Sequence, residues 1–178
     1  KPGRDGIHRP SHDYQGCVDQ VNSEGGFAFY CHPNVPNLKY INEGKDPLKA
    51  LKGLRGIELM NTGSIYYRKN LDRPVPYGFC AELWDDALSN GLRLWAYVGD
   101  DFHEYAEEYP CTALNVVAAK KVASEELMKN LKNGNFYVST GLILDEISVH
   151  GREIRIRAED ASLIRFIGYE GELLNKAT

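Results

Sequence analysis

Hydrophobic positions in the first two thirds of the chain switch repeatedly between the period of a buried strand and that of an amphipathic helix. Short apolar runs occupy residues 26–31, 56–60 and 92–98, with a fourth candidate over 112–118. Such runs are typical of strands buried in a parallel sheet. Between the runs, helical spacing is clearest over residues 79–90, where the apolar stripe consists of Cys80, Leu83, Trp84, Ala87 and Leu88. Further helices are predicted over 47–54 and from Ser124 onward, the latter with Leu127, Met128 and Leu131 facing inward.

After Asn133 the hydrophobic period falls to two. The strands that this period predicts are 136–139, 147–150, 153–157 and 163–167. The earlier rhythm of strand and helix predicts a parallel sheet covered by helices, with too few units to close a barrel. We therefore predict an α/β region over residues 1–133, followed by a small antiparallel β unit over residues 134–178.

The β unit is expected to pack against the α/β region. Residues 133–135 join the two parts without the Pro-, Ser- or Gly-rich spacer that a flexible tether needs. Leu142, Ile143, Leu144 and Ile147 supply more apolar surface than four short strands can hide among themselves. If the parts pack together, Ser139, Thr140 and Gly141 lie close to the α/β region and help to shape its pocket.

Charge and hydropathy narrow the range of partners. A formal net charge of -4 argues against nucleic acid, because phosphate binding needs a concentrated basic surface. No apolar run approaches the roughly 18 residues of a membrane span. The chain begins at Lys1 rather than Met, so we expect residues to precede it. Localisation and oligomeric state are left open.

The four cysteines (Cys17, Cys31, Cys80 and Cys111) show no C-x-x-C pairing. This spacing argues against a structural zinc site made of thiolates. Cys80 falls on the apolar stripe of its helix and is expected to be a small buried hydrophobe. The spacing leaves one disulfide open.

Polar residues that can bind metals collect where the predicted strands end. The first strand is followed by His32, the second contains Glu58 and ends at Asn61, and the third is followed by Asp101 and His103. Ligands of βα sheets bind at the carboxyl ends of the strands, so these side chains are expected at one rim. In an extended segment Asp101 and His103 point to the same side and can grip one ion. The alternative is that they are turn and helix-capping residues.

Four segments in this order resemble the polymerase and histidinol phosphatase (PHP) family of metal-dependent phosphoesterases. Residues 25–34 are similar to the strand that leads into the family's Ala-His-Pro motif, with Cys31 in place of Ala. Residues 56–61 are similar to the following strand with its Glu, and 83–103 to the last ligand-bearing strand and the helix before it. Residues 131–141 are similar to the exit from the barrel into a small β extension. The resemblance covers roughly residues 20–174.

The resemblance implies an α/β fold, a partial (β/α) barrel of the PHP type followed by the antiparallel β unit. It implies His32, Asp101 and His103 as ligands of divalent metal ions, with Glu58 in a supporting or substrate-orienting role. Zn, Mn and Fe all accept such mixed nitrogen and oxygen ligands. The implied activity is hydrolysis of a small-molecule phosphate ester.

One departure from the family concerns the missing ligands. The family's metal cluster also uses an H-x-H pair on its first strand, and the five histidines of this chain contain no such pair. The N-terminal half of the barrel is therefore expected to be absent, which leaves this chain inactive or weakly active.

Two other histidines near the N-terminus, His8 and His12, are spaced as a helical zinc pair would be, but Pro2, Gly3, Gly6 and Pro10 oppose a helix there. The hypothesis for this segment is a loop that contributes Arg9, His12 or Asp13 to substrate binding. His150 falls in a predicted hairpin turn and is interpreted as structural.

Two other functions remain open. The first is a module that binds a glycan or another ligand, or a purely structural module, with aromatic side chains lining its site: Tyr66, Tyr67, Tyr97, Phe102, Tyr105 and Tyr109. The second is a metal-dependent hydrolase acting on a non-phosphate bond, because metal ions serve carbonyl and phosphoryl centres alike. Cations around the substrate would favour a phosphate; the candidates are Arg9, Arg68, Lys69 and Arg73.

Overall fold

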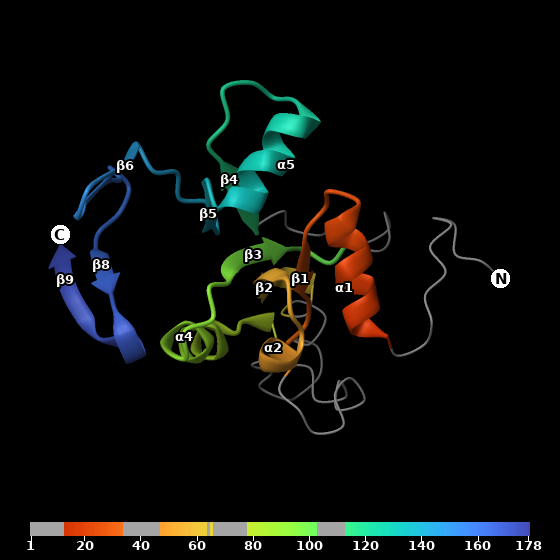
Figure 1. Cartoon of the computed structure of the whole chain (residues 1–178). Coiled ribbons are helices and arrows are strands. Elements are labelled where there is room, and N and C mark those ends of the chain that lie inside the picture. The colour runs from red at the N-terminus through yellow and green to blue at the C-terminus, as the bar shows by residue number, and fades with distance from the viewer. Residues whose placement is uncertain (1–12, 34–46, 64, 66–77, 103–112) are drawn as a thin grey trace.

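The computed structural model describes residues 13–33, 47–63, 65, 78–102 and 113–178 (Figure 1). Within these ranges the chain is mixed α/β, as the sequence predicts. None of the helices in the described ranges is long and apolar enough to cross a membrane.

A three-stranded parallel sheet forms the first part of the fold. Its strands are β1 (Ala28–Tyr30), β2 (Leu54–Asn61) and β3 (Trp95–Gly99), and β2 lies in the middle. Helix α2 (Pro47–Ala50) precedes β2, and α4 (Ala81–Ser89) connects β2 to β3 (Figure 1). Because all three strands run in the same direction, their carboxyl ends lie at one edge of the sheet.

One face of this sheet packs on the helices. The buried core cluster consists of Leu48, Ile57, Cys80, Ala87 and Leu94. Trp84 of α4 packs against this cluster, and its indole N–H donates to the Leu94 carbonyl at 2.8 Å. Of the predicted apolar stripe, Cys80, which precedes α4, and Ala87 are buried, whereas Leu88 is exposed.

The other face carries an aromatic cluster centred on Tyr97, which is 3 % exposed. The Tyr97 ring lies 5.3 Å from the Phe27 ring, 4.8 Å from Phe29 and 5.0 Å from Phe136, measured between centroids. Its hydroxyl donates to the Leu131 carbonyl at 3.0 Å. The cluster therefore ties β1 and β3 to the segment around residue 136.

Helix α1 (Tyr14–Ser23) has no counterpart in the sequence prediction. Asp13 begins it, and its carboxylate accepts the N–H of Gly16 at 2.8 Å. Val18 is its one buried residue among the described positions, and Gly16 sits in its first turn. A helix with so little apolar periodicity gives a weak sequence signal.

The pairing of the next two strands differs from the prediction. Strand β4 (Leu114–Val117) pairs antiparallel with β5 (Phe136–Ser139), whereas the sequence grouped 136–139 with the later strands. Between them α5 (Ser124–Asn133) ends at Gly134, whose φ of 77° is left-handed and turns the chain back. Residue period identifies a strand but not its partner, which explains the error.

The remaining strands form two antiparallel hairpins, of which the sequence predicts the first. Strand β6 (Glu146–His150) pairs with β7 (Glu153–Arg157). Strand β8 (Ile164–Ile167) pairs with β9 (Leu173–Ala177), which the sequence did not predict. The short helix η3 (Tyr169–Gly171) lies between β8 and β9 and contacts α4. There the backbone N–H of Glu170 donates to the Ser89 hydroxyl at 3.0 Å.

The described strands thus form one parallel sheet of three strands and three antiparallel sheets of two. Helices and strands are therefore mixed, and one of the antiparallel sheets, β4 with β5, joins residues on both sides of the predicted boundary at residues 133 and 134. The described strands do not join into a single barrel sheet.

Candidate metal site at the strand ends

A β-bulge in β2 places two polar side chains on the same face of the sheet. Glu58 pairs with Tyr97 and Met60 with Val98, so Leu59 is an extra residue in the register. In a regular strand Glu58 and Asn61, three residues apart, would point to opposite faces. Instead the Asn61 side-chain amide donates to Glu58 Oε1 at 3.2 Å. Both residues are buried, with 7 % and 2 % of their surface exposed.

Glu58 holds His32, which follows β1, by two contacts to the same oxygen. The His32 backbone N–H donates to Glu58 Oε2 at 2.8 Å, and the imidazole Nδ1 lies 3.0 Å from that oxygen. A carboxylate oxygen and an imidazole nitrogen at this distance need a proton between them, so we assign the proton to Nδ1. In this tautomer the Asn61 amide, whose Nδ2 lies 3.1 Å from Nδ1, cannot donate to that nitrogen and acts on the pair only through its bond to Glu58.

The opposite nitrogen of His32 faces Asp101, which follows β3. His32 Nε2 lies 3.7 Å from Asp101 Oδ2, and about a third of each side chain is exposed. With the proton on Nδ1, Nε2 presents a lone pair to a carboxylate. Two electron-rich groups placed in this way attract a cation between them.

Both candidate ligands have strained backbones. His32 has a φ of 50° and Asp101 a φ of 55°, in the left-handed region that non-glycine residues seldom occupy. Glu170 is the one further non-glycine residue in the described ranges with positive φ. Strain of this kind costs of order 1–3 kcal/mol per residue and clusters at functional sites.

The neighbouring carboxylate, Asp100, has a structural role. It accepts a hydrogen bond from the hydroxyl of Thr62, which is 1 % exposed. The backbone N–H of Gly63 donates to the Asp100 carbonyl at 3.1 Å. These bonds join the ends of β2 and β3, so Asp100 anchors the loop that presents Asp101.

Two thiols border the site, and both hold their protons strongly. Although Cys31 is exposed, desolvation raises the pKa of its thiol to about 11, and the carboxylates of Glu58 and Asp101 add to the shift. Burial raises the pKa of Cys80 to about 12, again with a contribution from Glu58. The Cys80 thiol donates to the Glu58 carbonyl at 2.8 Å. Cys80 therefore supports the bulge.

Of the five predicted site residues, the structure brings three together: His32, Glu58 and Asp101. His12 and His103 lie outside the described residues. Within the described ranges no group of three or more His, Cys, Asp or Glu side chains is arranged around a common ion position. The described part of the site thus places His32 Nε2 and Asp101 Oδ2 3.7 Å apart, with Glu58 behind the imidazole.

The sequence did not reveal how Asn61 and Thr62 act. The sequence places Asn61 among the polar residues expected at the rim but gives it no partner, and it does not single out Thr62. Their roles depend on the bulge and on the approach of β3, and neither feature leaves a periodic signal in the sequence.

Comparisons with protein-family models, with curated proteins and with solved structures found no match to this chain.

Proposed function

We propose that this chain supplies part of the metal centre of a hydrolase that cleaves phosphate esters, in a partial (β/α) barrel of the PHP type. The observation that carries the proposal is the position of His32 between two carboxylates, 3.0 Å from Glu58 and 3.7 Å from Asp101. The resemblance of the four sequence segments supports the same function.

The donor set fits a divalent ion. Two ligands bound at about 2.1 Å with a near-tetrahedral angle lie about 3.4 Å apart, close to the separation of His32 Nε2 and Asp101 Oδ2. A metal-binding imidazole usually donates its other N–H to a carboxylate, which fixes the tautomer and raises the basicity of the ligand. Glu58 is placed for that role. One imidazole and one carboxylate suit Zn, Mn or Fe.

Each residue of the site then has a defined task. His32 and Asp101 bind the ion, Glu58 keeps the proton on His32 Nδ1, and Asn61 orients Glu58. Held by His32 and Asp101, a divalent ion would supply a water of lowered pKa and positive charge opposite the phosphoryl oxygens. Asp100 and Thr62 hold the two strand ends at a fixed separation, so that Asp101 stays in reach of His32.

A complete centre needs more ligands than these two. His103 is our candidate for a third, and His12 for a residue that contacts the substrate. The H-x-H pair that the resemblance implies is not in this sequence. We therefore expect weak metal binding and little turnover from this chain by itself.

Of the aromatic side chains proposed for the glycan-binding alternative, the structure describes two, and Phe102 is 50 % exposed. Tyr97, one of its proposed aromatic side chains, is 3 % exposed and stacks inside the fold. Tyr66, Tyr67, Tyr105 and Tyr109 lie outside the described residues. So do Arg9, Arg68, Lys69 and Arg73, the cations that would favour a phosphate over another ester.

Calorimetric titration with Zn²⁺ and Mn²⁺ tests the proposal. We expect weak binding that His32→Ala and Asp101→Ala abolish, while His150→Ala, at the end of the exposed strand β6, leaves it unchanged. Hydrolysis of p-nitrophenyl phosphate by a longer protein containing this chain should fall with the same two variants. Metal binding that survives both substitutions would rule out this site.

A further inference from the structure

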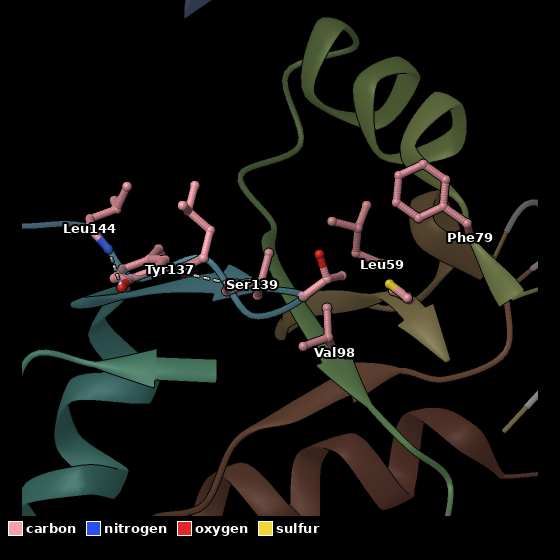
Figure 2. Close-up of a pocket in the computed structure, with 10 residues that line it drawn as sticks. Leu59, Phe79, Val98, Tyr137, Ser139 and Leu144 are labelled. Atoms are coloured by element: carbon pink, nitrogen blue, oxygen red, sulfur yellow. Dashed lines mark hydrogen bonds between the residues drawn. The ribbon is translucent and has the colours of Figure 1, made fainter. Parts of the chain in front are cut away.

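A cavity of about 380 Å³ lies between the parallel sheet and the strand that follows α5. Leu59 and Val98 from the sheet, with Phe79 at the bridge to β2, form one side; Tyr137 of β5 and Leu144 of the following turn form the other (Figure 2). This volume lies within the range of pockets that hold small organic ligands. Ser139 and Thr140 also line this cavity, which is distinct from the candidate metal site.

The lining defines the chemistry of a ligand. All of its side chains are uncharged, and most are aliphatic or aromatic. The Tyr137 hydroxyl accepts the N–H of Leu144 at 2.9 Å, which leaves its own proton for a further bond. Among the described residues no acceptor is found for that proton, and the hydroxyl of Thr140 is exposed at the rim of the cavity. The cavity thus suits a neutral ligand with an apolar body and one or two hydrogen-bonding oxygens.

The cavity and the candidate metal site lie on opposite faces of the sheet. Val98 and Gly99 are consecutive in β3, so they point to opposite faces. Val98 lines the cavity, whereas a Cβ atom at Gly99 would lie 4.0 Å from Glu58 Oε1. The residues around the bulge in β2 also serve both faces. Leu59 and Met60 line the cavity, whereas Glu58, bonded to Asn61, contacts His32.

We propose that this cavity is a binding site for a neutral aromatic or branched-alkyl compound carrying a hydroxyl or carbonyl oxygen, and that its occupancy shifts His32 through the β2 bulge. A ligand that presses on Leu59 and Met60 moves the backbone that positions Glu58, and Glu58 sets the orientation of the His32 ring. Packed interiors transmit such displacements because they contain little free volume. The binding site does not depend on the proposed hydrolase function.

Two probes of similar size separate this proposal from nonspecific apolar binding. 2-Naphthol is neutral at pH 7 and carries a hydroxyl, whereas naphthalene-2-sulfonate has the same ring system with a charge. In amide NMR titrations of the full chain, 2-naphthol should saturably shift Leu59, Val98 and Tyr137, and naphthalene-2-sulfonate should bind at least roughly tenfold more weakly. Equal binding of the two probes, or no saturable binding of 2-naphthol, would overturn the site.

Substitutions locate the binding. Val98→Phe fills the cavity and should weaken 2-naphthol binding at least roughly tenfold. Its control, Val149→Phe, makes the same change on the exposed strand β6 and should have no effect. Thr140→Val removes a rim hydroxyl with little change in shape, so it tests the pocket even if Val98→Phe perturbs folding. Binding unaffected by both cavity variants would overturn the site.

The effect on His32 has a separate readout. The imidazole resonances of His32 should move with the same dissociation constant as the Leu59 amide, and Val98→Phe should abolish both responses. Saturable binding that leaves the His32 ring unmoved would overturn the coupling. No metal or hydrolysis enters these measurements, so a failure here is distinguishable from a failure of the proposed metal centre.

Discussion

Glu58 Oε2 accepts from the backbone N–H of His32 and lies 3.0 Å from Nδ1 of the same residue. A single oxygen thus fixes both the backbone and the ring of His32. The position of this oxygen depends on the bulge in β2, because only the extra residue lets Asn61 reach Glu58. The orientation of the candidate ligand is therefore set by a strand irregularity one strand away.

Replacing Glu58 by Gln tests the supporting role directly. Glu58→Gln keeps the size of the side chain but removes its negative charge, so it no longer stabilises the Nδ1 proton as strongly. We expect divalent-metal affinity to fall about 10- to 100-fold, as measured by calorimetric titration. Glu146→Gln, the same change on the exposed strand β6, is the matched control. Equal affinities in the two variants would contradict the role of Glu58.

Because Asp101 has a positive φ, we expect glycine to be more stable than alanine at this position, the reverse of their order within a helix. At a φ of 55° glycine avoids the left-handed penalty that alanine carries, which is roughly 1–2 kcal/mol. Asp101→Gly should therefore be more stable than Asp101→Ala by about 1 kcal/mol in urea unfolding. At Lys129, exposed within α5, the order should reverse, because glycine destabilises a helix by about 1 kcal/mol relative to alanine. If alanine were more stable than glycine at Asp101 as well as at Lys129, the backbone of Asp101 would be unstrained in solution.

The Cys80 thiol predicts a loss of stability in alkali. Burial raises its pKa from 9.0 to about 12 in the folded chain. Above pH 9 the unfolded chain releases this proton while the folded chain keeps it, so the free energy of unfolding falls as pH rises toward 12. Below pH 9 the contribution is fully present.

The measurement compares wild type with Cys80→Ser, which keeps a donor for the Glu58 carbonyl but does not titrate in this range. Cys31 and Tyr97 also have raised pKa values, but they contribute equally to the pH dependence of stability in wild type and in Cys80→Ser. Urea midpoints should fall more steeply between pH 9 and 10.5 in wild type than in the variant. Parallel curves would mean that the Cys80 thiol ionises as readily in the fold as in the unfolded chain.

The sequence predicted the features of the fold that follow from the spacing of hydrophobic residues. The apolar stripe of α4 placed Cys80 and Ala87 in the core, and the end of each parallel strand marked the edge where His32 and Asp101 meet. The rule that parallel strands present their carboxyl ends together was sufficient for this step.

What the sequence could not predict depends on register and on long-range pairing. The bulge that joins Glu58 to Asn61 and the antiparallel pairing of β4 with β5 are both decided by contacts between distant segments. Nothing in residue type or spacing distinguishes a bulged strand from a regular one at this position. The burial of Tyr97 among other aromatic rings has the same origin, since it needs Phe136 from a strand 39 residues away.

Asn115 provides a test of how β4 is attached to the parallel sheet. Its side-chain amide donates to the Val98 carbonyl at 2.8 Å, and its side-chain oxygen accepts the Val98 N–H at 3.1 Å. The Asn115 side chain thereby makes the two backbone hydrogen bonds to Val98 that a neighbouring strand would otherwise make. Asn115→Leu preserves the approximate volume but leaves both backbone groups of Val98 without these partners. A buried polar group that loses its partner costs about 1–3 kcal/mol, so we expect a loss of that size in urea unfolding.

Asn133→Leu is the matched control, because Asn133 is exposed at the end of α5. It should change stability by less than about 0.5 kcal/mol, as is usual for surface positions. The amide of Val98 should also exchange with deuterium faster in Asn115→Leu than in the control, because its hydrogen bond is lost. Since Val98 also lines the cavity, accelerated exchange there without weaker 2-naphthol binding would show that the attachment of β4 and the shape of the cavity are independent. An Asn115→Leu variant as stable as the control would show that β4 is held to the sheet by packing alone.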